Sequence, residues 1–370
     1  MSRVAWLESR HSEAMKRQAV APAYGPAEAS KYTSFRDLKG LSNAAHEVVV
    51  EGLSVSSLNE ALEREPERLE AMLGRLATGA WADASLSANY SLHVLEVGAG
   101  EQPAVIRIKA QGAGVSHARF VVLPQPGVQR DVQIMFTDDG TPGHHLNVVF
   151  EVDVASASAL RLHVFQDHGD QSWLTATWAA KVAQDASFDA VWVDQGAALS
   201  RHDIQVALNE PGAQTQLSGL MVPRSGQHHD QHVHVCHGAS STTSRQLFKG
   251  LVAAGGRSVF SGCVEVLEAA ESCCADQLSR GLLLGHGAEF DARPQLLINV
   301  DAVEASHGTS CGAMDEAALF FLRSRGLDAE AAKHLLAEAF AGEVLEQLDD
   351  EALVQRGLDT VRGCLATRPS

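Results

Sequence analysis

The chain has 370 residues, a formal net charge of −17 and an apolar content of 45%. This length is sufficient for a large core with two or three structural regions. The negative charge argues against nucleic acid and anionic membrane surfaces as partners, because both attract clustered Lys and Arg. The sequence has no run of 18 uncharged apolar residues and no signal-peptide core. We therefore expect a cytoplasmic protein that binds neither nucleic acid nor membrane.

Residues 1–85 are expected to form an N-terminal region of helices and loops. The segment from Ser12 to Val20 is polar and helical in character, whereas Tyr24 to Ser30 contains two prolines and is typical of a linker. From Leu58 to Leu73, apolar residues recur at three- and four-residue spacing, which predicts a second helical stretch.

Residues 86–312 read as a series of short strands with a regular spacing. The centres of the clearest strands lie fourteen residues apart, at Ile106, Phe120, Ile134, Val148 and Leu162. The same step continues less clearly through Ala176, Ala190, Ile204, Ser218 and His232. A fixed period indicates a solenoid in which each turn stacks on the last, although a β-sandwich or jelly roll also produces regularly spaced strands.

Residues 313–370 are expected to be helical. A first helix between Asp315 and Gly326 has acidic residues in its first turn, basic residues in its last and a glycine stop. Asp328 is placed to cap a second helix, whose predicted apolar face contains Ala332, Leu335, Leu336, Ala339 and Phe340. A third stretch follows Leu345. Such a region either packs on the β body or docks a partner.

Histidine is the one residue type that suggests a metal site, with five of the 17 histidines between His228 and His237. If this segment is a strand, His232, His234 and Cys236 lie on one face, where three such donors suit a transition metal or form a polar surface. The His-x-His pattern also suggests a cupin-like, metal-dependent enzyme, but no carboxylate follows it. The sequence contains no P-loop or HExxH motif and no CxxC pair among its six cysteines.

One further candidate lies near the end of the β region. The segment Ser306-His307-Gly308 is predicted to be a turn between the last strand and the first tail helix. Side chains at such a junction are often presented to a ligand or partner, so His307 is a candidate functional residue.

Several motifs together resemble the SufB/SufD family of the SUF iron–sulfur cluster assembly machinery. They cover most of the chain and are most specific after Asp230: Ser244 to Gly250, Phe260-Ser261-Gly262, Pro294-Gln295-Leu296, Ser306-His307-Gly308, Asp315-Glu316 and Leu319 to Leu327. His237 and Gln277 also match family positions, and Pro26 to Thr33 resembles an N-terminal family element in which Ser30 replaces the usual Trp. The length and the helical start favour the SufD branch.

The resemblance implies a fold and a role. The fold would be a right-handed parallel β-helix, residues 86–312, flanked by N-terminal and C-terminal helical regions. The role would be that of a non-catalytic scaffold, not an enzyme, that pairs with SufB and binds the SufC ATPase. A transient iron or iron–sulfur cluster would be held at the SufB–SufD interface, and no cofactor would be bound permanently. A SufD homodimer is a further possibility. The metal-dependent, cupin-like enzyme using His228 to His237 remains the alternative.

The resemblance also implies particular site residues. His307 would contribute to the cluster site, and the tail would dock SufC through Phe320, Phe321, Leu322, Arg323, Arg325, Leu335 and Phe340. The family often has Cys-Ser-His-Gly where this chain has Ala305-Ser306-His307-Gly308. The essential thiolate would then come from SufB, which agrees with a SufD-like role, and Cys311 is not expected to replace it.

Overall fold

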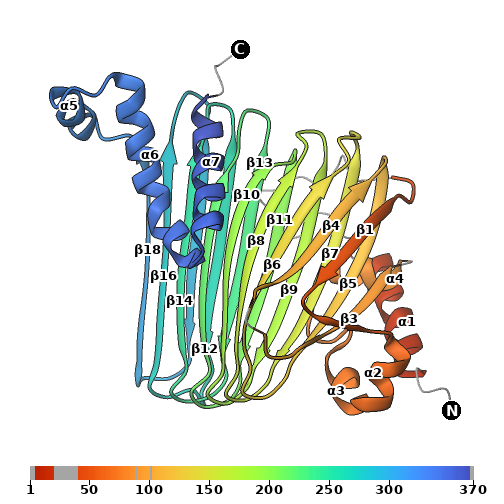
Figure 1. Ribbon diagram of the computed structural model, residues 1–370. Coiled ribbons are helices and arrows are strands. Elements are labelled where there is room, and N and C mark those ends of the chain that lie inside the picture. Colours follow the sequence, from red (N-terminus) through yellow and green to blue (C-terminus); the bar gives the residue numbers. More distant parts are fainter. Residues whose placement is uncertain (1–4, 21–40, 89, 101, 367–370) are drawn as a thin grey trace.

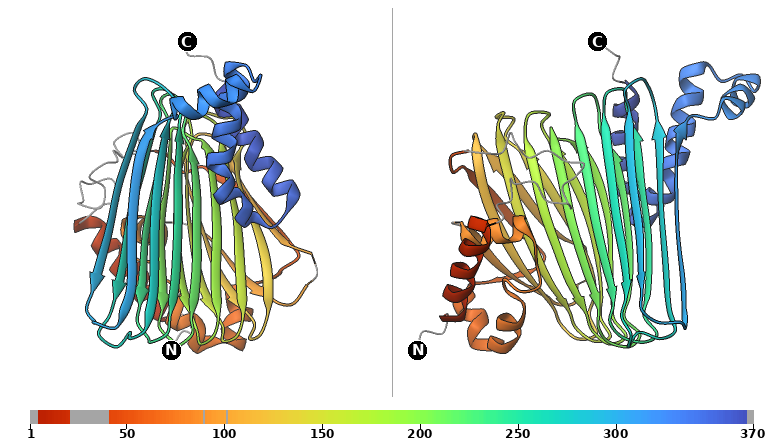
Figure 2. Two further views of the ribbon diagram at one scale, coloured as in Figure 1. Left: turned by 90° about the vertical axis from the view of Figure 1, so that its left-hand side faces the viewer. Right: turned by 180° about the vertical axis from the view of Figure 1, so that it is seen from behind.

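The computed structural model describes residues 5–20, 41–88, 90–100 and 102–366. It is a parallel β-helix with helices at both ends of the chain (Figures 1 and 2). The predicted linker at Tyr24 to Ser30 and the family element at Pro26 to Thr33 lie outside the described residues.

The chain alternates between two nine-stranded sheets that face each other across the core. Sheet B contains, in spatial order, β1 (Ala45–Glu51), β4 (Ala104–Gln111), β6 (Gln129–Asp138), β8 (Ala159–His168), β10 (Ser187–Gly196), β12 (Gln214–Val222), β14 (Thr243–Val252), β16 (Cys273–Leu283) and β18 (Val303–Ala313). Sheet A contains β2 (Ser54–Ser56), β3 (Ser91–Val97), β5 (Gly114–Pro124), β7 (His144–Val154), β9 (Trp173–Val182), β11 (Leu199–Leu208), β13 (His228–His237), β15 (Arg257–Val266) and β17 (Glu289–Ile298).

The strand register explains the fourteen-residue spacing in the sequence. Ile106 pairs with Ile134 in sheet B, and Val148 pairs with Ala176 in sheet A, so one full turn takes 28 residues at these positions. Each turn contains one strand of each sheet, and a half-turn therefore takes about fourteen. The predicted β-helix is confirmed, and the weakly matching positions Ala176 and Ser218 also lie in strands, β9 and β12.

The core consists of inward-facing side chains that repeat from turn to turn. Phe120, Phe150 and Trp178 occupy successive paired positions in sheet A, and their rings stack with centroids 4.5 and 4.4 Å apart. Stacked parallel strands place like positions directly over one another, so aromatic residues at the same register form a continuous column. Because inward-facing side chains stack in this way, each turn of the column constrains the position of the strand that stacks on it.

The N-terminal end of the solenoid consists of strands that the sequence did not indicate. β1 pairs with β4 and β2 with β3, both antiparallel, whereas the later pairs are parallel. The expectation that the first 85 residues are helices and loops is therefore wrong for residues 45–56. The side chains of β1 alternate between half-exposed and exposed, and none is buried. The strand therefore lacks the strong alternation of apolar and polar residues that would reveal it in the sequence.

The N-terminal helices cover the outer face of sheet A. These are α1 (Ala5–Val20), α2 (Leu58–Arg64), α3 (Pro66–Met72) and α4 (Ala80–Ser87). Leu69 and Leu73 pack on Val121 and Leu123 of β5, which buries this strand on both of its faces. A capping box between Ser57 and Glu60 starts α2.

The C-terminal helices lie on the outer face of sheet B. They are α5 (Glu316–Ser324), α6 (Ala329–Leu345), η3 (Glu346–Leu348) and α7 (Glu351–Ala366). Asp315 and Asp328 accept hydrogen bonds from Ala317 N and Ala331 N, which confirms Asp328 as the cap of α6. The predicted apolar face of α6 is only partly correct, because Ala332, Ala337, Ala341, Val344 and Leu345 are buried whereas Leu335 is 47% exposed.

A buried ion pair fixes the N-terminal helices to the solenoid. Arg119 of β5 and Glu151 of β7 are both fully buried, with Nη1 and Oε2 2.6 Å apart. Glu151 also accepts hydrogen bonds from Gly74 N and Ala77 N, and Arg119 donates to Ala82 O. The pair therefore provides hydrogen-bond partners for backbone groups between α3 and α4 and in the first turn of α4, whereas Nε of Arg119 has no partner within the described structure.

Removing one member of this pair should leave a buried charge without compensation. We expect Arg119→Met to lower the free energy of unfolding by about 3 kcal/mol in a urea denaturation experiment. The exposed pair of Arg107 and Glu51 provides the control, since Arg107→Met should cost less than about 1 kcal/mol. Equal losses in the two variants would contradict the role given to Arg119.

Candidate functional site

The C-terminal end of the solenoid is the most unusual surface of the described chain. β17 and β18 are the last strands of their sheets, and no other described strand pairs with their outer edges. Their residues are mostly exposed or half-exposed, in contrast to the buried strands before them. A solenoid end without a cap exposes both backbone groups and interior side chains.

His307 lies inside this open end. Its backbone pairs with Gln277 within β18, so the prediction of a Ser-His-Gly turn is wrong: the ladder continues through Gly308 to Ala313. Val303 and Ala305 pack against the buried residues Val264 and Cys273 of the interior. Because side chains alternate along a strand, His307 faces the same interior side as Val303 and Ala305. Its side chain remains exposed because no further strand of the described structure stacks on β18.

A polar column leads from the core to His307. Gln277 of β16 is fully buried and donates to Gln246 Oε1 of β14 over 2.9 Å. The amide oxygen of Gln277 has no hydrogen-bond partner within the described structure. A buried amide oxygen normally accepts a hydrogen bond. The oxygen of Gln277 could therefore accept one from a donor group at the open end of the solenoid.

His237, the other residue matched to the family, lies farther inside the solenoid. Its Nδ1 and Nε2 are 2.8 Å from Thr242 Oγ1 and Ser244 Oγ respectively. Burial lowers the pKa of His237 to about 4, so the ring is neutral at pH 7. The structure places Gln277 directly beside His307 in the register of β16 and β18, whereas His237 lies in β13 of the other sheet.

The aromatic side chain that ends the apolar core was not recognised from the sequence. Phe290 of β17 packs so closely on Gly250 and Gly281 that a Cβ at these positions would come within 2.7 and 2.4 Å of its ring. The pair of glycines at equal register in β14 and β16 was the available signal. Phe290 therefore packs against the apolar core near this end of the solenoid.

The predicted docking residues of the tail fall into two groups. Phe320 and Phe321 of α5 are 75% and 56% exposed, and no residue of α5 is buried. Figure 1 shows α5 standing clear of the sheets, beyond β18. Leu322 is half-buried, and Arg323 and Arg325 are exposed, with the Arg325 guanidinium 5.2 Å from the centre of the Phe321 ring.

Phe340 belongs instead to the contact between α6 and the solenoid. Its carbonyl oxygen accepts a hydrogen bond of 2.6 Å from Nζ of Lys249, and its ring lies 4.7 Å from the same ammonium group. Lys249, in β14, is 2% exposed and also pairs with Glu343 at 2.5 Å. Burial lowers the pKa of Lys249, although Glu343 opposes this effect. Lys249 thus anchors α6, a role that the sequence did not suggest.

The histidine-rich segment forms β13, and the prediction that His232, His234 and Cys236 share a face is confirmed. The three side chains do not converge: His232 Nε2 lies 3.2 Å from Asp230 and His234 Nε2 lies 3.1 Å from Glu265. In the described parts of the chain, no group of three His, Cys, Asp or Glu residues could hold a metal ion with the side chains as they stand. A cupin is a closed double-sheet roll, whereas these strands form a parallel solenoid, so the structure gives no support to the cupin alternative.

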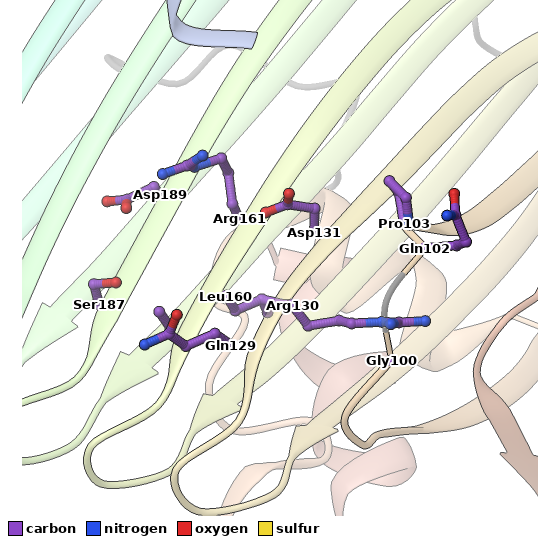
Figure 3. A pocket seen from close by; sticks show the side chains of 11 residues that line it. Gly100, Gln102, Pro103, Gln129, Arg130, Asp131, Leu160, Arg161, Ser187 and Asp189 are labelled. Atoms are coloured by element: carbon purple, nitrogen blue, oxygen red, sulfur yellow. The ribbon is translucent and has the colours of Figure 1, made fainter. Parts of the chain in front are cut away.

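A pocket of about 360 Å³ lies at the surface near β6, β8 and β10 (Figure 3). Its charged lining residues are Arg130, Asp131, Arg161 and Asp189, two of each sign. Arg161 also forms an ion pair with Asp349, next to α7. The mixed charge does not select one class of ligand, and we assign no site there.

The comparisons with known proteins can now be set beside this geometry. The family model described as SUF system FeS cluster assembly, SufBD core domain, matches residues 106–340. The chain belongs to the SufBD family. The match includes most of the solenoid, its open end, α5 and α6 as far as Phe340.

Individual relatives agree with the family match. The chain is 34% identical over 60% of its length to an iron–sulfur cluster assembly SufBD family protein of Synechocystis sp., covering 48% of that protein. It is 29% identical over 72% of its length to the iron–sulfur cluster assembly protein SufD of Escherichia coli, covering 61% of it. It is 30% identical over 68% of its length to protein ABCI7, chloroplastic, of Arabidopsis thaliana, covering 53%. The chain thus spans about half to three fifths of these relatives. No helix among the described residues is both long and apolar enough to cross a membrane.

The buried, neutral state of His237 makes stability depend on pH. In the unfolded chain this ring takes up a proton below its ordinary pKa of 6.5, whereas in the folded chain it does so near pH 4. The unfolded state therefore binds more protons between these values, and stability falls as the pH is lowered through this window, by up to about 3 kcal/mol.

We expect His237→Gln to show a shallower loss of unfolding free energy than the unmodified protein between pH 6.5 and 4. Urea denaturation at a series of pH values measures this slope. His286→Gln, at an exposed turn position, should leave the slope unchanged. Identical slopes for the His237 variant and the unmodified protein would refute the assignment.

Proposed function

We propose that this SufBD protein is a SufD-type, non-catalytic scaffold of a cytoplasmic SUF complex, in which it pairs with SufB and binds the SufC ATPase. The observation that carries the proposal is the uncapped end of the solenoid, where β17 and β18 expose their edges and His307 faces the interior. The name of the family and the printed name of its relative in Escherichia coli support the assignment.

Pairing through the end strands would satisfy the backbone groups of β17 and β18. A second solenoid of the same family presents the same kind of edge, because its strands have the same period and spacing. Apolar side chains near this edge, Leu297 at 50% and Ile298 at 39% exposure, would also become covered. SufB is the proposed partner, and a SufD homodimer would use the same surface.

The seam between the two subunits is the proposed place for a transient iron or iron–sulfur cluster. His307 would contribute a neutral imidazole, which ligates iron through an unprotonated ring nitrogen. This chain has Ala305 two residues before His307, so the thiolate ligand would come from the partner. The cluster is cargo in this scheme, not a permanent cofactor.

The tail is the proposed attachment for SufC. Phe320 and Phe321 offer an exposed apolar surface next to Arg323 and Arg325, the combination that is enriched at interface centres. Movement of SufC on binding ATP would act on α5 and α6. Because Lys249 anchors α6 to β14, such a movement would be transmitted to the solenoid beside the seam.

His307→Ala should reduce iron and sulfide loading of the reconstituted complex by about tenfold, because one ligand of the nascent cluster is lost. His286→Ala is the matched control, since His286 is also exposed and lies in the turn between β16 and β17. Co-purification of the subunits establishes that the complex still forms. Unchanged loading in the His307 variant would remove this residue from the mechanism.

The double substitution of Phe320→Ser and Phe321→Ser should weaken binding of SufC at least tenfold in a titration monitored by calorimetry. Reversal of charge at Arg323 and Arg325 should also weaken it. Met15→Ser on α1 tests for a general effect of removing an exposed apolar side chain, since Met15 is 55% exposed. Full affinity in both tail variants would place the SufC contact elsewhere.

A further inference from the structure

Four side chains of types that commonly bind metal ions lie together on the outer face of sheet A, and their Cα positions form a rectangle. In the register of β13 and β15, His234 lies opposite Cys263 and Cys236 lies opposite Glu265. Within each strand the two residues are separated by one position, so all four point to the same side of the sheet. The sequence suggested His232, His234 and Cys236 on one strand, but it gave no indication that Cys263 and Glu265 lie beside them.

The rectangle is small enough for all four side chains to reach a single ion above its centre. Neighbouring strands lie about 4.8 Å apart and alternate residues about 6.6 Å apart, which puts its centre about 4 Å from each Cα atom. The two side chains on one diagonal already meet, with His234 Nε2 3.1 Å from Glu265 Oε2. A surface pocket of about 240 Å³ is lined by His234 and Cys263 but not by Cys236 or Glu265, so it gives solvent access to one side of the rectangle.

The electrostatics of this face favour a cation. Burial raises the pKa of Cys236 and Cys263, and the negative charge of Glu265 raises both further. The same charge attracts a metal ion, which in turn stabilises the two thiolates. Two soft sulfur ligands with one imidazole and one carboxylate match the preferences of Zn²⁺ and Fe²⁺ and exclude Mg²⁺ and Ca²⁺.

We propose that His234, Cys236, Cys263 and Glu265 form a tetrahedral site for a divalent transition-metal ion on the outer face of β13 and β15. Without metal, the hydrogen bond between His234 and Glu265 takes the place of the ion, and the donors are not yet convergent. Binding replaces this hydrogen bond and requires rotation of side chains, whereas the strands stay in register. Each thiol that ligates releases its proton to the solvent, so affinity rises with pH.

This site is separate from the proposed cluster position. His307 lies on the inner side of β18 in sheet B, whereas the rectangle lies on the outer side of sheet A. The two proposals can therefore fail independently.

Titration of the purified full chain with Co²⁺ tests the site, because thiolate ligation gives sulfur-to-cobalt charge-transfer absorption that ligation by histidine does not. We expect one equivalent of Co²⁺ with this absorption and with the intense visible bands of tetrahedral cobalt, displaced by Zn²⁺. The absorption should be lost in Cys236→Ser and in Cys263→Ser. His234→Ala and Glu265→Gln should weaken affinity at least tenfold.

Two controls make the experiment decisive. Cys274→Ser should retain the full signal, since Cys274 is exposed and also lies near a carboxylate, Glu304, with Sγ and Oε2 3.8 Å apart. His307→Ala should retain it as well. The four substituted side chains of the rectangle and Cys274 face outward, and His307 is exposed at the end of the solenoid, so circular dichroism should report an unchanged fold. Binding of Co²⁺ without the charge-transfer absorption, or with equal absorption in the Cys236 and Cys263 variants, would overturn the proposal.

Discussion

The architecture depends on one constraint: each strand of the solenoid obtains its backbone hydrogen bonds from the preceding and following turns of the same sheet. Successive turns therefore keep a common register, as the stacked rings of Phe120, Phe150 and Trp178 illustrate. At the N-terminal end, β1 and β2 complete the ladders by pairing in the antiparallel direction. At the other end, the ladders of the described structure end at the parallel strands β17 and β18, and the last turn exposes side chains of its interior face.

The helices reinforce this asymmetry between the two ends. Those near the N-terminus cover sheet A and are held by the buried pair of Arg119 and Glu151. Those near the C-terminus cover sheet B, where Lys249 holds α6, but α5 extends past the last strand (Figure 2). The open edge and the exposed phenylalanines of α5 consequently lie at the same end of the molecule. In the proposed complex, one subunit would bind at each of these surfaces.

The fold was predictable from the sequence because a solenoid repeats its signal. Fourteen-residue spacing survives local irregularity, so even Ala176 and Ser218 occupied strands. Local patterns were less reliable. Gly308 suggested a turn at His307, but pairing with β16 keeps the chain extended there. The buried face of α6 is rich in alanine, whose small side chain allows the helix to approach the sheet closely. Because alanine contributes little to a hydrophobic pattern, the sequence does not reveal which face of α6 packs on the sheet.

In the candidate sites, too, some residues were predictable from the sequence and others were not. The resemblance to the SufB/SufD family singled out His307, and a single strand pattern singled out His234 and Cys236. Neighbours from other strands, such as Gln246 beside Gln277 or Cys263 beside His234, depend on the register between strands. That register results from turn lengths that vary along the solenoid: the step from one strand to its neighbour is 28 residues at Ile106 and 30 residues at Val132. A single sequence does not specify such offsets.

Hydrogen–deuterium exchange of the amides of β17 and β18, measured for the chain alone and with SufB, tests the central claim most directly. If the open end of the solenoid is the subunit interface, these amides exchange rapidly in the isolated chain and become strongly protected in the complex. The amides of β1, at the N-terminal end of the solenoid, should change little. A stable complex in which β17 and β18 exchange as fast as they do in the free chain would contradict the account.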